Sequence, residues 1–170
     1  GTQGLFTIEV AGQFGSRELS FASGTTRQTI VDAINTYTDV TGVSASLFNS
    51  STSAGLRLNS TNYGSDGFVS VRVVNAANIQ GAGVGVYRAI GTNANAPDLS
   101  QQTLFTSQAA KNATRDPGQD LVATINGVAA TTKGRTARIN TDFLDVEITF
   151  NAVTATRTNG LSSVNAFTIT

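Results

Sequence analysis

Short stretches in which apolar and polar residues alternate run along most of the first half of the chain. A period of two is typical of a β-strand with one buried side and one side facing solvent. Turns rich in Gly, Asn and Ser separate these stretches, at residues 12–15, 49–55 and 62–67. The pattern therefore predicts antiparallel strands. Their buried positions are Phe6, Ile8, Val10, Leu19, Phe21, Val43, Ala45, Leu47, Leu56, Leu58, Val69, Val71 and Val73.

A second run of alternating residues begins at Asp120. In it, Asn126-Gly127 is a typical two-residue hairpin turn. Three or four strands with one apolar face form a small sheet rather than an independent sandwich. We therefore expect these strands to pair with strands of the first half. The apolar positions of this run are Leu121, Ala123, Ile125, Ala137, Ile139, Leu144, Val146, Ile148, Phe150, Phe167 and Ile169.

One segment departs from the period of two. Ile30, Ala33 and Ile34 follow the i, i+3, i+4 spacing of an amphipathic helix, which we expect over about residues 26–36. Thr25 and Gln28 fit a capping box at its start. Three turns are too few for a stable isolated helix in water, so the pattern predicts that this one is packed on a sheet.

These elements predict an α+β fold that is mostly β, with antiparallel sheets, one short helix and two β-rich lobes. We expect residues 1–90 to form a β-rich lobe that contains the helix. Residues 91–118 are expected to form an irregular connection, and residues 119–170 the second lobe. Gly81, Gly83 and Gly85 lack the spacing of a dinucleotide-binding loop, which favours an edge strand there.

The charge of the chain argues against two classes of partner. The formal net charge is zero, and only 13% of the residues are charged. A chain with this charge does not attract a nucleic acid or an anionic membrane over a distance. No segment has the run of apolar residues that a membrane span needs. The nearest thing to a basic cluster is Lys133, Arg135 and Arg138, which is interpreted as a solvated turn and strand face.

The sequence suggests no catalytic, cofactor-binding or metal-binding residues. It has no His and no Cys, which excludes a Ser–His pair and the usual zinc-binding motifs. Asp142, Asp145 and Glu147 lie close together, and the last two fall on the polar face of a predicted strand. Asp116 and Asp120 flank Pro117-Gly118, where a plain turn is favoured over a calcium loop.

Two further groups of residues are candidate binding or modification sites. Asn49, Asn59 and Asn112 each begin an Asn-x-Ser/Thr triplet, which a chain rich in Ser and Thr also produces by chance. Tyr63 and Tyr87 have rings that can stack on a sugar, although packing explains them equally well.

Two quoted stretches carry a resemblance to a known family. "RELSFASGTTRQTIVDAINTYTDVTGVSASL" followed by "GLRLNSTNYGSDGFVSVRV", about residues 17–74, resembles the insert motif of bacterial flagellins and hook-associated proteins. The later stretch "DLVATINGVAATTKGRTARINTDFLDVEITFN", with the closing "FTIT", is similar to flagellin variable regions.

The resemblance implies a structural role in the bacterial flagellar filament, outside the cell, with export by the flagellar secretion system and no enzymatic activity. Other flagellin subunits are the implied partners. The long terminal helices by which flagellins polymerise are not in these residues, and the start at Gly1 looks like mid-protein sequence. We therefore expect an excised outer, surface-exposed domain. The alternatives are a domain of a filament-cap or hook-associated protein, and an adhesin module that binds host or environmental glycans.

Overall fold

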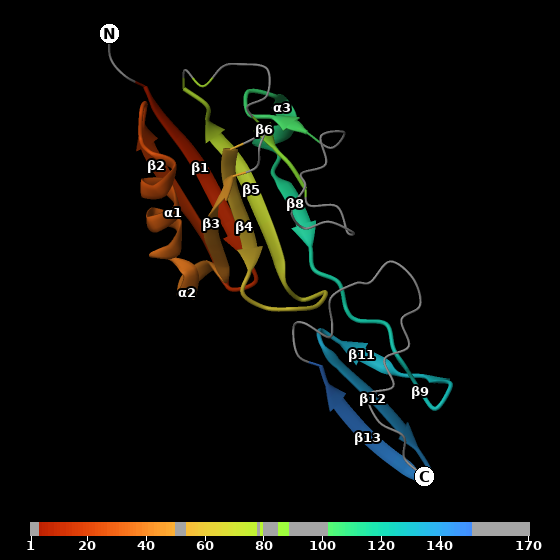
Figure 1. Cartoon of the computed structure of the whole chain (residues 1–170). Coiled ribbons are helices and arrows are strands. Elements are labelled where there is room, and N and C mark those ends of the chain that lie inside the picture. The colour runs from red at the N-terminus through yellow and green to blue at the C-terminus, as the bar shows by residue number, and fades with distance from the viewer. Residues whose placement is uncertain (1–3, 50–53, 78, 80–84, 89–101, 151–170) are drawn as a thin grey trace.

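The computed structural model describes residues 4–49, 54–77, 79, 85–88 and 102–150. The protein is mostly β with antiparallel sheets, which confirms the predicted fold class. Figure 1 shows two bodies, which are called here the main lobe (residues 4–118) and the hairpin lobe (residues 119–150).

The largest sheet of the main lobe has four antiparallel strands in the order β2-β1-β5-β8. The alternation predicted from the sequence gives its inner face, on which Ile8 lies opposite Leu19 on one side and Val73 on the other. On the outer face Arg72 bonds to Glu9 at 2.5 Å and lies 3.5 Å from Glu18. The strands are β1 (Leu5–Gly12), β2 (Gly15–Ala22), β5 (Phe68–Asn75) and β8 (Thr114–Pro117).

A second layer covers the inner face of this sheet (Figure 1). It consists of the hairpin β3 (Val43–Asn49) and β4 (Ala54–Ser60), together with the helices α1 (Arg27–Asn35) and α2 (Thr38–Thr41). The two layers meet closely, because a Cβ on Gly12 would lie only 2.3 Å from the carbonyl oxygen of Thr41. The buried cluster between the layers is Ile8, Val10, Phe21, Val31, Ile34, Val43 and Ala45.

The helix predicted over about residues 26–36 is α1, but the predicted capping box is wrong. The N-cap is Thr26, whose hydroxyl accepts a hydrogen bond from the backbone N–H of Thr29. The hydroxyl of Thr25 instead donates to the carbonyl of Ala22, and Gln28 bonds to a carboxylate one turn later in the helix. Both residues have local partners that compete with the box, and the cap therefore moves by one position.

The apolar side of α1 is wider than the predicted stripe. Val31 and Ile34 are its buried residues, whereas Ile30 and Ala33 are partly buried against the same cluster. Burial of these side chains contributes several kcal/mol at about 25 cal/mol per Å². The TDVTGV segment after the helix forms the single turn of α2, which ends at Gly42 with a φ of 73°.

A polar side chain also joins α1 to the hairpin beside it. The amide of Asn35 donates to the carbonyl of Ala45 at 3.0 Å and accepts from the N–H of Ala45 at 2.7 Å. This pair of bonds reproduces what a neighbouring strand would offer to β3. It therefore fixes the position of the helix along the strand in a way that apolar contacts cannot.

The hairpin lobe consists of small sheets. β11 (Thr131–Lys133), β12 (Thr136–Thr141) and β13 (Leu144–Thr149) form one in that order, and β9 (Thr124–Ile125) pairs with β10 (Val128–Ala129). The predicted turn at Asn126-Gly127 is confirmed, since both residues have positive φ angles, 50° and 79°, as a type I′ hairpin requires.

The stretch expected to be an irregular connection contains regular elements in its described part. β7 (Thr103–Leu104) pairs with β6 (Gly85–Val86), α3 (Gln108–Lys111) follows, and β8 extends the main sheet. Within the described residues, the strands after residue 118 pair only with one another. Gly81, Gly83, Phe167 and Ile169 lie outside the described residues. The lobe boundaries, and the pairing of the second lobe with the first, stay predictions.

Candidate functional site

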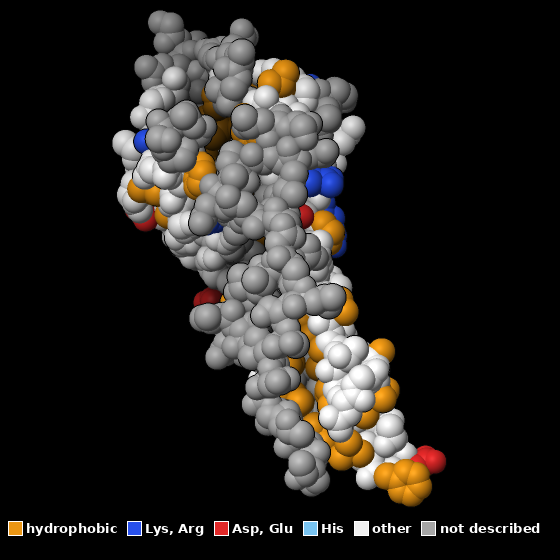
Figure 2. Space-filling view, turned by 45° about the vertical axis from the view of Figure 1, so that its right-hand side comes forward, with side chains coloured by type: hydrophobic (Ala, Val, Ile, Leu, Met, Phe, Trp, Pro, Cys, Tyr) orange, Lys and Arg blue, Asp and Glu red, His pale blue; other side chains and the backbone are white. Residues whose placement is uncertain are grey.

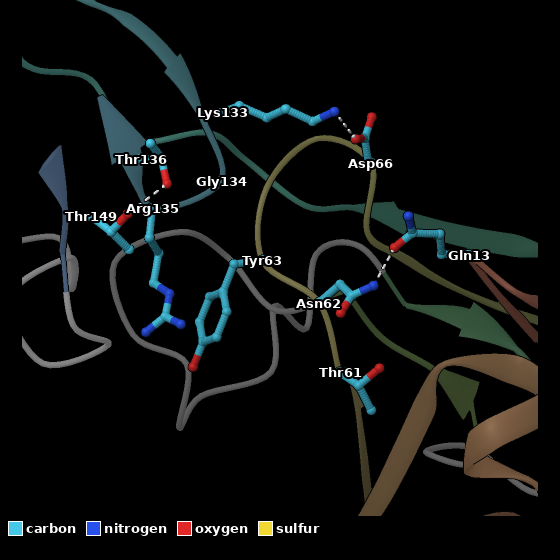
Figure 3. A pocket seen from close by; sticks show the side chains of 10 residues that line it. All are labelled: Gln13, Thr61, Asn62, Tyr63, Asp66, Lys133, Gly134, Arg135, Thr136 and Thr149. Carbon is cyan, nitrogen blue, oxygen red and sulfur yellow. Dashed lines mark hydrogen bonds and ion pairs between the residues drawn. The ribbon is translucent and has the colours of Figure 1, made fainter. Parts of the chain in front are cut away.

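An open, polar hollow lies where the two lobes meet (Figure 3). Its volume is about 410 Å³. Four segments line it: the turn between β1 and β2, the loop between β4 and β5, the turn between β11 and β12 with the start of β12, and the end of β13. The lining residues are Gln13, Thr61, Asn62, Tyr63, Asp66, Lys133, Gly134, Arg135, Thr136 and Thr149.

Most of the polar side chains that line the hollow are bonded to each other. Asn62 donates to the side-chain carbonyl of Gln13 at 2.6 Å. Lys133 lies 2.9 Å from the carboxylate of Asp66, which raises the pKa of Lys133. Figure 3 shows these pairs across the walls of the hollow, together with a hydroxyl pair between β12 and β13. Of these pairs, only Lys133 with Asp66 joins the two lobes. Groups that satisfy one another in this way leave little to hold a ligand.

Asp120 makes the densest set of contacts beside the hollow. Its carboxylate accepts hydrogen bonds from the backbone N–H and the hydroxyl of Ser65, at 2.9 and 2.7 Å, and from the N–H of Gly134 at 2.7 Å. These bonds hold the pKa of Asp120 below its usual range, with the hydroxyl of Ser65 as the largest cause. Asp116 is on β8 opposite Val69 and takes no part in this network.

The three cations of the sequence cluster do not form a shared basic patch. Lys133 pairs with Asp66, and the guanidinium of Arg135 lies 4.2 Å from the ring centre of Tyr63. Arg138 donates two hydrogen bonds to the carboxylate of Asp145, at 2.9 and 2.6 Å, which lowers the pKa of that carboxyl. Each of these cations thus has its own partner on the surface, which agrees with the interpretation of the cluster as a solvated face.

The remaining carboxylates of that run also lie on the surface. Asp142 is exposed in the turn between β12 and β13, and Glu147 is exposed on β13. Over the part of the chain that the structure describes, no group of three or more acidic, His or Cys residues is placed to hold a metal ion. In the same part, no helix is long and apolar enough to cross a membrane.

The aromatic and Asn candidates have separate surroundings. Tyr63 belongs to the hollow, where one face of its ring is covered by Arg135. Tyr87 accepts a hydrogen bond from the amide of Gln102 at 2.6 Å, away from the hollow. Asn49, Asn59 and Asn112 are exposed, on β3, on β4 and after α3.

Nothing in the sequence pattern predicts the contacts that Ser65 and Gly134 make with Asp120. Ser65 is one polar residue in a loop rich in Ser and Gly, and 55 residues separate it from Asp120. The available signal was the glycine content of three separate turns. Glycines mark places where backbones approach closely, but they do not say which segments meet.

Comparison with known proteins gives one match, and it falls on the main lobe. Residues 6–62 match the family model described as the flagellin hook IN motif. This segment of the chain is therefore similar to the flagellin hook IN motif and is called here the IN motif. No curated protein and no solved structure matches the chain.

The IN motif coincides with the central part of the main lobe. It covers both layers, from β1 through α1 and α2 to the end of β4, and includes the entire buried cluster. The matched segment starts and ends earlier than the stretch of about residues 17–74 on which the resemblance was based. Since β5 lies after the motif and pairs with β1, the motif depends on later residues to complete its sheet.

Proposed function

We propose that this chain is an outer, surface-exposed part of a flagellin subunit in the bacterial flagellar filament. The observation that carries the proposal is the IN motif at residues 6–62, whose core is the core of the main lobe. In this role the chain is structural rather than enzymatic. It sets the surface properties of a filament used for motility, outside the cell.

The surface of the described residues supports this role. Its charges are few, and some of them are paired, as Arg72 is with Glu9 and Arg138 with Asp145. Neutral hydroxyl and amide groups provide much of the remaining polarity. A neutral polar surface suits a domain repeated along a filament, because neighbouring copies do not repel one another over a distance. Other flagellin subunits are the proposed partners.

Antibodies raised against the 170-residue chain provide the test. They are applied to intact flagella of the source organism and located by immunogold electron microscopy. The proposal expects gold along the whole filament. Gold confined to the distal tip would assign the chain to the filament cap, and gold confined to the base of the filament would assign it to a hook-associated protein. Intact flagella without gold would overturn the proposal.

Glycan binding is left as an alternative and not proposed. The exposed ring nearest to a concave surface is that of Tyr63, and Arg135 already occupies one of its faces. A sugar would have to displace this contact or stack on the other face. A glycan array probed with the isolated chain distinguishes this alternative from a purely structural role.

A further inference from the structure

Three segments form the connection between the lobes and are called here the joint: residues 61–67 of the main lobe, residues 118–121, and residues 133–135 of the β11–β12 turn. The carboxylate of Asp120 touches both sides of it. Two of its three hydrogen bonds come from Ser65 in the main lobe, and the third comes from Gly134 in the hairpin lobe. A single anion therefore connects loops that no strand pairing joins within the described residues.

The joint is also tightly packed. A Cβ on Gly64 would lie 2.6 Å from both the Asp120 carboxylate and the Cα of Gly134. A Cβ on Gly118 would lie 2.1 Å from the carbonyl oxygen of Gly64, and the N–H of Gly118 donates to the carbonyl of Gly67 at 2.7 Å. Backbone meets backbone here, so the half-buried carboxylate is held in one defined position.

The other contacts across the joint are weaker constraints. The ion pair of Lys133 with Asp66 is solvent-exposed, with side-chain exposures of 80% and 55%. Such pairs are readily screened and hold long side chains at an entropic cost. Arg135 stacks on Tyr63, which is itself exposed. Asp120 has a short side chain whose carboxylate accepts hydrogen bonds from three donors. It therefore fixes the direction of the hairpin lobe better than either of these two contacts.

We propose that Asp120 is a positioning residue that sets the direction of the hairpin lobe relative to the main lobe, and that loss of its charge lets the lobes reorient while each stays folded. The buried cluster of the main lobe contains no residue of the joint. The hairpin lobe keeps its own ladder, and Leu121 still donates to the carbonyl of Gly134. The contacts at risk are therefore those to Ser65. The inference does not depend on the proposed function.

The chain has no Cys, so a pair of spin labels can be attached at chosen sites without background. Cysteines are introduced in the 170-residue chain at Gln28 on α1 and Asn140 on β12, both exposed. Pulsed electron–electron double resonance then measures the distribution of distances between the two labels, one in each lobe. We expect one narrow distribution in the parent and a distribution at least twice as wide in Asp120→Ala. Asp142→Ala, which removes an exposed carboxylate outside the joint, is the control and leaves the parent distribution unchanged.

A narrow, parent-like distribution in Asp120→Ala would overturn the proposal. Circular dichroism of the same samples is expected to show parent-like β content. Loss of that content in Asp120→Ala would also overturn it, since the lobes would then need the carboxylate in order to fold. Ser65→Ala removes only the hydroxyl donor, and an intermediate width is expected. Asp120→Asn removes the charge but keeps one oxygen that accepts from the N–H groups of Ser65 and Gly134, so it is expected to widen the distribution less than Asp120→Ala does.

The pH dependence of the distance distribution is a second test, because a role of Asp120 that did not depend on its charge would not produce it. Hydrogen bonding lowers the folded-state pKa of Asp120. The contribution of its carboxylate to the joint is therefore complete above the unfolded-state pKa of about 3.9, and it is lost as the pH falls through the lower folded-state pKa. The charged side chain that acts on this carboxylate is Lys133, which also bonds to Asp66. We expect the parent distribution to widen below about pH 4, whereas Asp120→Ala is already wide at neutral pH. An equal response in both proteins would overturn the assignment to Asp120.

Discussion

The main lobe and the hairpin lobe use the same kind of strand but differ in what covers it. In the main lobe, a helix and a hairpin close over one face of the sheet, and Val10, Ile34 and Val43 are at most 2% exposed. In the hairpin lobe, the buried apolar residues among those described are Ala137 and Ile139, while Val122 and Phe143 are 98% exposed. Figure 2 shows apolar side chains gathered along the surface of this lobe.

The difference shows how a second layer changes the origin of stability. Two layers around one cluster remove apolar surface from water on both sides, which is the dominant favourable term in folding. The described sheet of the hairpin lobe is stabilised by cross-strand pairs, such as Arg138 with Asp145, and by its contacts with the main lobe at the joint. Pairs of this kind contribute less, so we expect the two lobes to respond very differently to substitution.

The largest effect is expected for Ile34→Asp on α1. Ile34 is 2% exposed within the buried cluster, and a carboxylate there has no partner. We expect a loss of more than about 4 kcal/mol and unfolding of the main lobe, measured by thermal melting with circular dichroism. Ser46→Asp, which places the same charge on an exposed strand position opposite Arg57, is the control. A parent-like melting temperature in Ile34→Asp would show that α1 is not packed as described.

Ile139→Asp applies the same change to the hairpin lobe, where Ile139 is 6% exposed. We expect a smaller cost, about 3 kcal/mol, because fewer side chains surround the site. Hydrogen exchange measured by mass spectrometry should show lost protection in residues 131–149 and unchanged protection in α1. If protection falls equally in both lobes, they form one cooperative unit and the contrast between them does not hold.

Asn35→Ala tests the polar connection within the main lobe. The change removes both hydrogen bonds to the backbone of Ala45. We expect a loss of about 1–3 kcal/mol, since the groups left behind are partly buried. Urea denaturation measures it, with Asn59→Ala on the exposed side of β4 as the matched control. Equal stability of the two variants would mean that apolar contacts alone position the helix.

The smallest effect is expected for Arg138→Ala on β12. The ion pair with Asp145 is half exposed on both sides, so it should add little to stability at physiological salt. We expect a slight fall in melting temperature at low ionic strength that disappears near 1 M salt, where charges are screened within about 3 Å. A large fall that persists at high salt would show that the hairpin lobe depends on this pair more than the comparison allows.

Much of the main lobe could be predicted because its signals are local. The alternation around Ile8 and Val10, and the helical spacing of Ile30 and Ile34, specify element types by side-chain periodicity alone. The true cap at Thr26 was missed because a one-residue shift depends on competing local hydrogen bonds. Val31 was missed because the buried side of the helix is wider than the predicted stripe. The turn at Asn126-Gly127 was predicted because both of its residues tolerate positive φ angles.

The site was harder to predict than the fold, since its residues are far apart in the chain. No periodicity relates Ser65 to Asp120 or Asn35 to Ala45. The same holds for β8, which lies within the stretch expected to be irregular and pairs with β5, a strand more than forty residues earlier. A polar residue in a loop does not reveal its partner until the loops are placed.

The order of apolar and polar residues by itself determined the strands that alternate, the helix and the mostly β class, because each depends on neighbours a few positions away. Only the tertiary structure decided which strands share a sheet, that β5 completes the motif, and that Asp120 bridges the two lobes. Long-range contacts follow from which surfaces can be buried together in three dimensions, and that choice is not written in the spacing of any one segment.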